Sequence, residues 1–444
     1  MHQATPAAAL PRGATALFAV ACGTAVANVY FAQPLLVALG NEFAIAPAAL
    51  GTVVTLTQTG YGLGLFLIVP LGDRLDPRRL ITAQLLLLAA ALLFVATATS
   101  SAALLAGMAS VGLLAVVTQS LVACAASFTE PARRGRVVGT VTSGVVTGIL
   151  LARTVSGLLG DLAGWRSVYL TSAVLTCAAA LALYRVIPRR DTPAPTPGYG
   201  RLLTSTVRLF TRERLPRLRA LFALLVFAAF STLWSSVTLV LSDPPMSLSS
   251  TAIGAFGLLG AAGALAANVA GRLNDRGHAN RTTGIGLALL TLSWLPLALT
   301  RQSLWALAAG VVLLDLAVQA VHVTNQSLIH ALHPEAGSRL IGGYMVFYSI
   351  GSAVGALAAT TLYAMAGWGA VCVLGAGFSG LALVIWALTE RGAARPAGKM
   401  RDAIRPAGKK RDAIRASGKK RPVVRPAGKM STTTHDPAGA RPRR

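Results

Sequence analysis

The sequence predicts an all-α membrane protein in which twelve transmembrane helices form two pseudo-symmetric six-helix bundles. Of the 444 residues, 54% are hydrophobic and only 12% are charged, whereas soluble domains carry about 25% charged residues. Apolar runs long enough to cross a bilayer recur along the chain, and the two halves share residues at a constant spacing. These observations together indicate the fold class.

The individual spans follow from the apolar runs, because a bilayer core is crossed by roughly 20 apolar residues in helical conformation. We expect spans at residues 14–39, 49–71, 79–99, 102–127, 137–160, 167–187, 220–241, 252–272, 282–300, 304–328, 341–365 and 369–389. The first run is too long for the apolar part of a signal peptide, and no small-residue cleavage pattern follows it. We therefore expect it to be an uncleaved transmembrane helix.

The two halves of the chain resemble each other at fixed positions. The residues Pro131, Arg136, Gly139, Gly148, Gly164 and Trp165 recur 203 positions later as Pro334, Arg339, Gly342, Gly351, Gly367 and Trp368. Parallel repeats with a site between them are typical of secondary transporters. The predicted organisation is an N-terminal bundle at 1–187, a cytoplasmic central loop at 188–219, a C-terminal bundle at 220–390 and a disordered basic tail at 391–444.

Arginines are distributed unequally between alternate loops. One set of loops contains Arg74, Arg78, Arg79, Arg133, Arg134, Arg136, Arg272, Arg276, Arg281 and Arg339, and the other contains only Arg166 and Arg301. The positive-inside rule places the basic loops in the cytoplasm. We therefore expect a multi-pass protein of the inner (cytoplasmic) membrane with both termini cytoplasmic. Within the central loop, residues 201–219 are expected to form a basic amphipathic helix on anionic lipid.

More than half of the net charge of +25 lies in the tail, where 11 Arg and 6 Lys stand against three Asp from residue 391 onward. The tail repeats with a period of ten, as in RPAGKMRDAI and RPAGKKRDAI. A segment rich in Pro, Gly and basic residues cannot bury an apolar core. We expect it to contact anionic lipid headgroups, and we expect no specific nucleic-acid partner.

A basic motif lies between the second and third spans of each half. The first copy contains Leu71, Asp73, Arg74 and Arg78, and the second contains Gly271, Asp275 and Arg276. The motif resembles the G-x-L-x-D-R-x-G-R-R signature of the major facilitator superfamily, although Val69, Asp76 and Pro77 depart from it. The resemblance implies the major facilitator fold, with a cytoplasmic gate formed by these charged residues and Gly271. Alternatively, they are only positive-inside loop charges.

Residues 10–390 are similar to the bacterial drug:proton antiporter and efflux branch of that superfamily. The fifth span of this branch carries a G-x-x-x-G-P-x-x-G-G motif, to which Gly148 and Gly157 correspond. Ala152 and Arg153 stand where the motif has Gly and Pro. The departure places a charged residue inside the fifth span.

Two charged side chains lie deep in the predicted spans, Arg153 in the fifth and Asp315 in the tenth. A charge at the bilayer centre costs roughly 2.5–3.5 kcal/mol. One interpretation is a permanent ion pair that fixes helix packing. The other is that Asp315 carries the coupling proton, because a low-dielectric site favours the neutral carboxyl. His322 is either a proton relay or a structural histidine.

Polar and aromatic residues are predicted to line a central cavity. Helical spacing places Asp315, Gln319, His322 and Gln326 on one face of the tenth span, and the family resemblance implies that spans 1, 4, 7 and 10 line the pathway. The candidate substrate-contacting residues are Asn28, Tyr30, Gln33, Gln58, Tyr61, Gln119, Trp234, Ser235, Gln319, Asn325, Gln326, Tyr344 and Tyr348.

The predicted function is secondary active transport, by proton-coupled efflux of a small organic compound or drug through alternating access. The alternatives are an uptake symporter for a small organic anion or metabolite, in which Arg153 contacts the anion, and a nontransporting membrane sensor. No phosphate-binding loop, nucleophile motif or metal-spaced cluster is present in the sequence, so we expect neither an enzyme nor a cofactor or metal. The expected partners are the substrate, protons and the lipid bilayer, and the expected state is a monomer.

Overall fold

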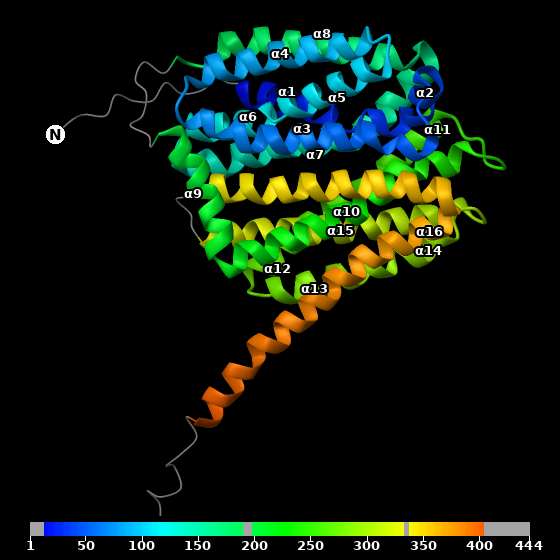
Figure 1. Cartoon of the computed structure of the whole chain (residues 1–444). Coiled ribbons are helices and arrows are strands. Elements are labelled where there is room, and N and C mark those ends of the chain that lie inside the picture. The colour runs from blue at the N-terminus through cyan, green and yellow to red at the C-terminus, as the bar shows by residue number, and fades with distance from the viewer. Residues whose placement is uncertain (1–12, 190–197, 333–336, 404–444) are drawn as a thin grey trace, which may run out of the picture. The chain divides into compact units, whose positions relative to one another are not determined.

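The computed structural model describes residues 13–189, 198–332 and 337–403, and within these ranges every regular element is a helix. The chain forms two units, Met1–Leu388 and Thr389–Arg444. The first unit is the helical bundle described below (Figure 1). In the second unit the backbone remains helical through Ala403, and the rest of the predicted tail, 404–444, lies outside the described residues.

The N-terminal half contains six helical segments of bilayer length. Two segments are divided into consecutive helices, α1 (Ala14–Ala27) with α2 (Ala32–Phe43), and α5 (Ser101–Ala115) with α6 (Val117–Ser127). The others are α3 (Gly51–Leu67), α4 (Pro77–Ala96), α7 (Pro131–Ala163) and α8 (Trp165–Val186), with 3-10 turns η1 (Pro47–Ala49) and η2 (Val69–Asp73) on either side of α3. The side chains of Asp76 and Ser100 accept hydrogen bonds from the first turns of α4 and α5. Such N-caps define where these two helices begin.

The C-terminal half follows the central helix α9 (Tyr199–Arg212). It consists of α10 (Arg214–Ser242), α11 (Ser250–Ala255), η3 (Phe256–Gly260), α12 (Ala261–Asp275), α13 (Ala279–Leu292), α14 (Trp294–Ala298), α15 (Leu304–Leu332) and α16 (Gly337–Ala403). Ten segments of the described residues are long and apolar enough to cross a membrane. The helices α13 and α14 together make one further span, and α16 contains two spans that meet at Gly367. The twelve-helix architecture therefore agrees with the prediction.

Several predicted spans differ in detail from the observed helices, and two of these differences involve prolines. The span expected at 220–241 begins too late, because α10 starts at Arg214 and Pro216 occupies its first turn. The span expected at 282–300 is divided between α13 and α14, with Pro296 inside the second helix. The helix is interrupted by a turn at Ser293, three residues before Pro296. Proline lacks the N–H that would donate to the preceding turn of an α-helix.

The repeated glycine and tryptophan residues adopt matching conformations in the two halves. Gly164 and Gly367 both have positive φ, 78° and 72°, a backbone region that favours glycine. The tryptophans that follow are both buried: Trp165 Nε1 donates to Glu42 at 2.5 Å, and Trp368 Nε1 donates to the Leu297 carbonyl at 2.8 Å. The shared turn supports the internal duplication read from the sequence.

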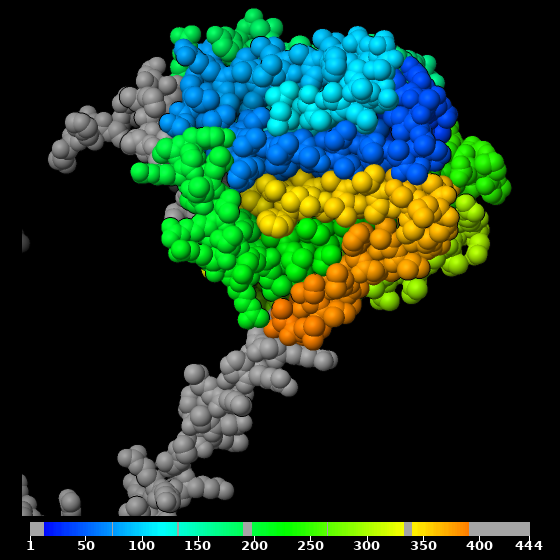
Figure 2. Space-filling model, viewed as in Figure 1, coloured from blue at the N-terminus to red at the C-terminus, as the bar shows by residue number. Residues whose placement is uncertain are grey.

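Close helix contacts also repeat between the halves. A Cβ added at Gly148 of α7 would lie 2.3 Å from the carbonyl oxygen of Gly23 in α1. At the equivalent Gly351 of α16, it would lie 2.1 Å from the carbonyl oxygen of Leu224 in α10. Small residues permit such approaches between membrane helices. The two halves also meet on one face along α3 and α16, whose atoms lie side by side in Figure 2.

Candidate functional site

Arg153 lies in α7 and is almost fully buried, with 2% of its surface exposed. Its Nε donates a hydrogen bond to Oε1 of Gln33 at 2.7 Å. The guanidinium lies 3.9 Å from the ring centre of Trp234, 5.1 Å from that of Tyr30 and 5.6 Å from that of Phe230. Cation–π contacts and a charge-assisted hydrogen bond thus stabilise the buried cation. Its Nη2 has no hydrogen-bond partner among the described residues.

Asp315 lies in α15, in the opposite half, and is 6% exposed. Neither Asp315 nor Arg153 belongs to the ion pair that joins Arg166 to Glu42. Asp315 and Arg153 therefore interact electrostatically without a direct salt bridge. The indole of Trp234 approaches the carboxylate without hydrogen-bond geometry, and no described group hydrogen-bonds to Oδ1. The interpretation as a fixed, direct ion pair does not describe this conformation.

Both charges flank the same short segment of the eighth span. Here the five-residue 3-10 helix η3 interrupts the α-helix, and its backbone completes a turn about every three residues. A Cβ added at Gly257 would lie 3.0 Å from Cβ of Arg153, and one added at Gly260 would lie 2.6 Å from Oδ2 of Asp315. The absence of a side chain at these two positions lets both charged residues pack closely against η3.

His322 belongs to a polar cluster within the C-terminal half. Its Nδ1 lies 2.9 Å from the hydroxyl of Tyr344, and its Nε2 lies 3.1 Å from Nε2 of Gln326. Gln319, nearer to Asp315 on α15, packs against Gly263 of α12 instead. The predicted polar face of α15 therefore divides between α16 and α12.

A second buried arginine extends this cluster toward the central loop. The sequence places Arg219 in that loop, because it precedes an apolar run. In the structure it lies inside α10 and is 6% exposed. Its Nη1 donates hydrogen bonds to Thr283 Oγ1 at 3.1 Å and Asn325 Oδ1 at 3.3 Å. Sequence reasoning missed this residue because an arginine at a helix end usually extends its charged group to the interface.

The remaining cavity candidates occupy several different environments. The hydroxyls of Tyr30 and Tyr348 lie 2.5 Å apart and connect the two halves, whereas Tyr61 interacts with Gln119 inside the N-terminal half. Gln58 and Ser235 are buried, and no described group hydrogen-bonds to Gln58 Oε1 or Ser235 Oγ.

Asn28 is positioned by its own half. Its Oδ1 accepts a hydrogen bond from Ser172 of α8 at 2.7 Å, and its Nδ2 donates to the carbonyl oxygens of Thr24 and Ala25. The side chain therefore fastens α1 to α8. Its predicted contact with substrate stays a prediction.

The predicted gate residues lie at the end of the bundle that carries the basic loops, hereafter the basic end. Asp73 ends η2, and its side chain lies outside the described residues. Arg78 stacks on the Tyr184 ring at 4.0 Å, while Asp76 accepts from the Arg78 N–H and caps α4. The first copy thus includes a packing contact for Arg78 as well as loop charge.

The second copy is more open. Arg74 of the first copy and both Asp275 and Arg276 of the second are exposed. A Cβ added at Gly271 would meet nothing within 4 Å, and the same holds for Gly139 on α7. An added methyl group would therefore be accommodated at Gly139 and Gly271 in this conformation, and the predicted gate role of Gly271 stays a prediction.

The opposite end, hereafter the closed end, joins the two halves by hydrogen bonds. Asp161 of α7 accepts from the backbone N–H of Ser250 at 3.2 Å, and from the N–H and the hydroxyl of Thr251 at 2.7 Å each. On the other side of the bundle, the N–H of Gly51 donates to Thr360 at 3.0 Å. These bonds cross between α7 and α11 and between α3 and α16.

A cavity of about 650 Å³ remains at the closed end. It is bordered by Asn41 from the N-terminal half and by Asp243, Arg301, Tyr363 and Ala364 from the C-terminal half. The Tyr363 hydroxyl donates to Asp243 at 2.5 Å. The cavity therefore lies between residues of both halves, at the end where hydrogen bonds join the halves.

Comparison with known families gives the decisive match. The sequence profile of the Major Facilitator Superfamily matches residues 15–282 and 246–431, which together include all twelve spans. The chain belongs to the Major Facilitator Superfamily. It is therefore a multi-pass membrane transporter, and its two bundles are the two halves of the major facilitator fold.

Two bacterial transporters are similar to most of the chain. It is 44% identical over 370 residues to the "Putative uncharacterized transporter YgaY" of Escherichia coli (strain K12), covering 83% of this chain and 94% of that protein. It is 34% identical over 403 residues to the "Probable transporter SCO4007" of Streptomyces coelicolor, covering 87% and 90% respectively. These relatives share the transporter class with this protein.

Solved major facilitator structures share the fold at low sequence identity. A bacterial homologue of the human lysosomal transporter Spinster, in an inward-facing and occupied conformation, has a TM-score of 0.69 at 15% identity, covering 88% of this chain and 98% of that one. The human organic anion transporter MFSD10 has a TM-score of 0.62 at 19% identity, covering 84% and 99%.

Proposed function

We propose that this major facilitator protein exports a small organic compound in exchange for protons, with Asp315 as the proton-carrying group and Arg153 as its electrostatic partner. The observation that carries the proposal is their placement: one buried charge from each half, both against η3, and both with a polar atom that no described group satisfies. Buried polar atoms without protein partners mark positions for water or ligand.

The proposed coupling follows from electrostatics in a low-dielectric site. Protonation of Asp315 removes its charge and with it the attraction to Arg153, and such interactions are stronger inside a protein than in water. Because α7 and α15 belong to different halves, a change in this attraction biases how the halves rock. A proton and a substrate that compete for the same site are then exchanged across the membrane.

The proposed setting is the inner membrane, with the basic end and both termini in the cytoplasm and the protein acting as a monomer. The open basic end and the hydrogen-bonded closed end then correspond to an inward-facing conformation. The Gly148 and Gly157 matches support membership in the drug:proton antiporter branch, while Arg153 distinguishes this chain within it. The basic tail is proposed to contact anionic headgroups on the cytoplasmic side.

Transport in everted membrane vesicles tests the proposal. A panel of fluorescent organic dyes is offered with an imposed proton gradient, which a protonophore then collapses. We expect gradient-dependent dye accumulation that Asp315→Asn abolishes and Asp243→Asn retains, because Asp243 is an exposed carboxylate at the closed end. Gradient-driven transport that persists in Asp315→Asn would refute the assigned role of Asp315.

A second candidate is uptake of a small organic anion, favoured by the Arg153 Nη2, which lacks a described hydrogen-bond partner. In this case a substrate carboxylate binds the guanidinium. The fold shared with a human organic anion transporter supports the alternative only as a comparison of architecture. Accumulation of anionic dyes by right-side-out vesicles, without accumulation by everted ones, would select it over export.

A further inference from the structure

The amphipathic helix α9 crosses the ends of two spans that belong to different halves. At its start, the Tyr199 hydroxyl donates to the carbonyl of Leu67 at the end of α3, at 2.6 Å. Toward its end, Phe210 stacks on Phe347 of α16 with ring centroids 5.8 Å apart and fills the space at Gly343. Figure 1 shows α9 lying across the ends of α3 and α16. It therefore connects the two halves at the basic end.

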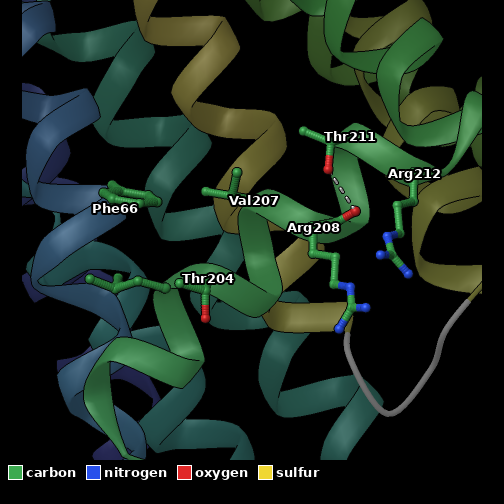
Figure 3. Close-up of a pocket in the computed structure, with 7 residues that line it drawn as sticks. Phe66, Thr204, Val207, Arg208, Thr211 and Arg212 are labelled. Atoms are coloured by element: carbon green, nitrogen blue, oxygen red, sulfur yellow. Dashed lines mark hydrogen bonds between the residues drawn. The ribbon is translucent and has the colours of Figure 1, made fainter.

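A groove of about 500 Å³ separates α9 from the end of α3. Its apolar wall is formed by Phe66, Leu203 and Val207, and its polar rim contains Arg208 and Arg212. The two arginines are four residues apart, which places them on one face of the helix, and Figure 3 shows both guanidinium groups on the same side of α9. The groove thus combines an apolar surface with two adjacent cations.

The apolar wall continues onto the outer surface of α3. Leu63 and Leu67 are 51% and 40% exposed, in a span whose exposed leucines face the bilayer core. Val207 of α9, in the groove, is 49% exposed. A ligand that occupies the groove therefore meets cations at the membrane surface and apolar side chains toward the bilayer interior.

We propose that the groove binds an anionic phospholipid of the adjacent leaflet, with its phosphate on Arg208 and Arg212 and an acyl chain on Phe66 and the exposed leucines of α3. Arginine binds phosphate oxygens through several donors at once. The continuous apolar wall favours a lipid over a soluble anion. The bound lipid stabilises α9 where it connects the halves, and this site is independent of substrate and direction of transport.

Native mass spectrometry of the full-length protein, with phosphatidylglycerol or phosphatidylcholine added to the detergent, tests the site. We expect a retained phosphatidylglycerol adduct that phosphatidylcholine does not reproduce. Arg208→Gln with Arg212→Gln should weaken the apparent Kd for phosphatidylglycerol by about tenfold or more. The charge-matched control is Arg201→Gln with Arg217→Gln, which removes two exposed arginines outside the groove and should leave the adduct in place.

A second variant keeps the test decisive if the double arginine variant does not fold. Val207→Glu introduces a carboxylate into the groove and should also abolish the phosphatidylglycerol adduct. Equal weakening by the control pair, an unchanged adduct in the folded groove variants, or full competition by inorganic phosphate would each overturn the proposal. The last outcome identifies a free-anion site in place of a lipid site.

Discussion

At the scale of single residues, Arg153 shows how a membrane interior holds a cation without a bound carboxylate. Burial of the charge costs roughly 2.5–3.5 kcal/mol. A hydrogen bond to a charged group contributes about 1.5–3 kcal/mol, and a desolvated cation–π contact contributes about 2 kcal/mol. The bond to Gln33 and the stacking on Trp234 are therefore of the size needed to offset the burial.

This balance predicts that Arg153→Lys is destabilising although it preserves charge. A lysine lacks the planar group that stacks on Trp234 while it bonds to Gln33, so we expect the free energy of unfolding to fall by about 1–3 kcal/mol. Thermal unfolding in detergent measures the change. Arg166→Lys is the matched control, because the exposed Arg166–Glu42 pair is worth only about 0–1 kcal/mol. Equal destabilisation by the two substitutions would contradict the account.

At the scale of elements, η3 is the part of the structure that brings the two charges together. Gly254, Gly257, Gly260 and Gly263 recur every third residue, and three residues per turn align such positions where the backbone is 3-10. An added Cβ at Gly254 would lie 2.3 Å from the Arg153 carbonyl oxygen. Within the 3-10 segment itself, Gly257 and Gly260 present an edge without side chains to Arg153 of α7 and Asp315 of α15.

A substitution within η3 should therefore act on the charge site. In Gly260→Ala the new methyl group would lie 2.6 Å from Oδ2 of Asp315, so the carboxylate or the helix must move, at a cost of about 1–3 kcal/mol. We expect lower stability and a loss of proton-dependent transport in vesicles. Gly377→Ala of α16, where a Cβ meets nothing within 4 Å, should retain both. If the proton dependence of transport is unchanged in Gly260→Ala, then η3 does not take part in proton coupling.

At the scale of the whole bundle, hydrogen bonds between the halves determine which end is closed. The carboxylate of Asp161 receives three donors from the start of α11, and a negative charge at a helix N-terminus is also favoured by the helix dipole. At the basic end, α7 and α12 have open space at Gly139 and Gly271. Opening the closed end must break the Asp161 contacts.

Asp161→Asn should shift the bundle toward opening of the closed end. Removal of the charge weakens these bonds by about 1 kcal/mol or more, which corresponds to about a fivefold change in the ratio of conformations. An Ala364→Cys reporter in the closed-end cavity, in a Cys177→Ser background because Cys177 is the exposed natural cysteine, should react faster with an impermeant maleimide.

The control for this measurement is Glu42→Gln, which removes a carboxylate that bonds to Trp165 and Arg166 within the N-terminal half. It changes charge on the same side of the molecule without touching the contact between halves. Its labelling rate should match that of the parent. A rate that rises equally in both variants would assign the effect to surface charge.

The amino-acid sequence is sufficient to predict the membrane class, the twelve spans, the two repeats and the presence of two charges within spans. Each of these depends on local composition or on residues repeated at a fixed spacing, and a bilayer accepts little besides long apolar helices. The break between α13 and α14 and the early start of α10 escaped prediction, because hydropathy averages over the turns and helix ends that define such boundaries.

The groups that surround the two charges follow from the folded structure and not from the sequence. The folded structure placed Gln33 and three aromatic rings around Arg153 where sequence reasoning weighed a direct pair with Asp315, and it revealed Arg219 as a buried residue. It also decided which end of the bundle is closed. These features depend on contacts between helices far apart in the chain, and hydropathy, a property of neighbouring residues, carries no information about which distant side chains pack together.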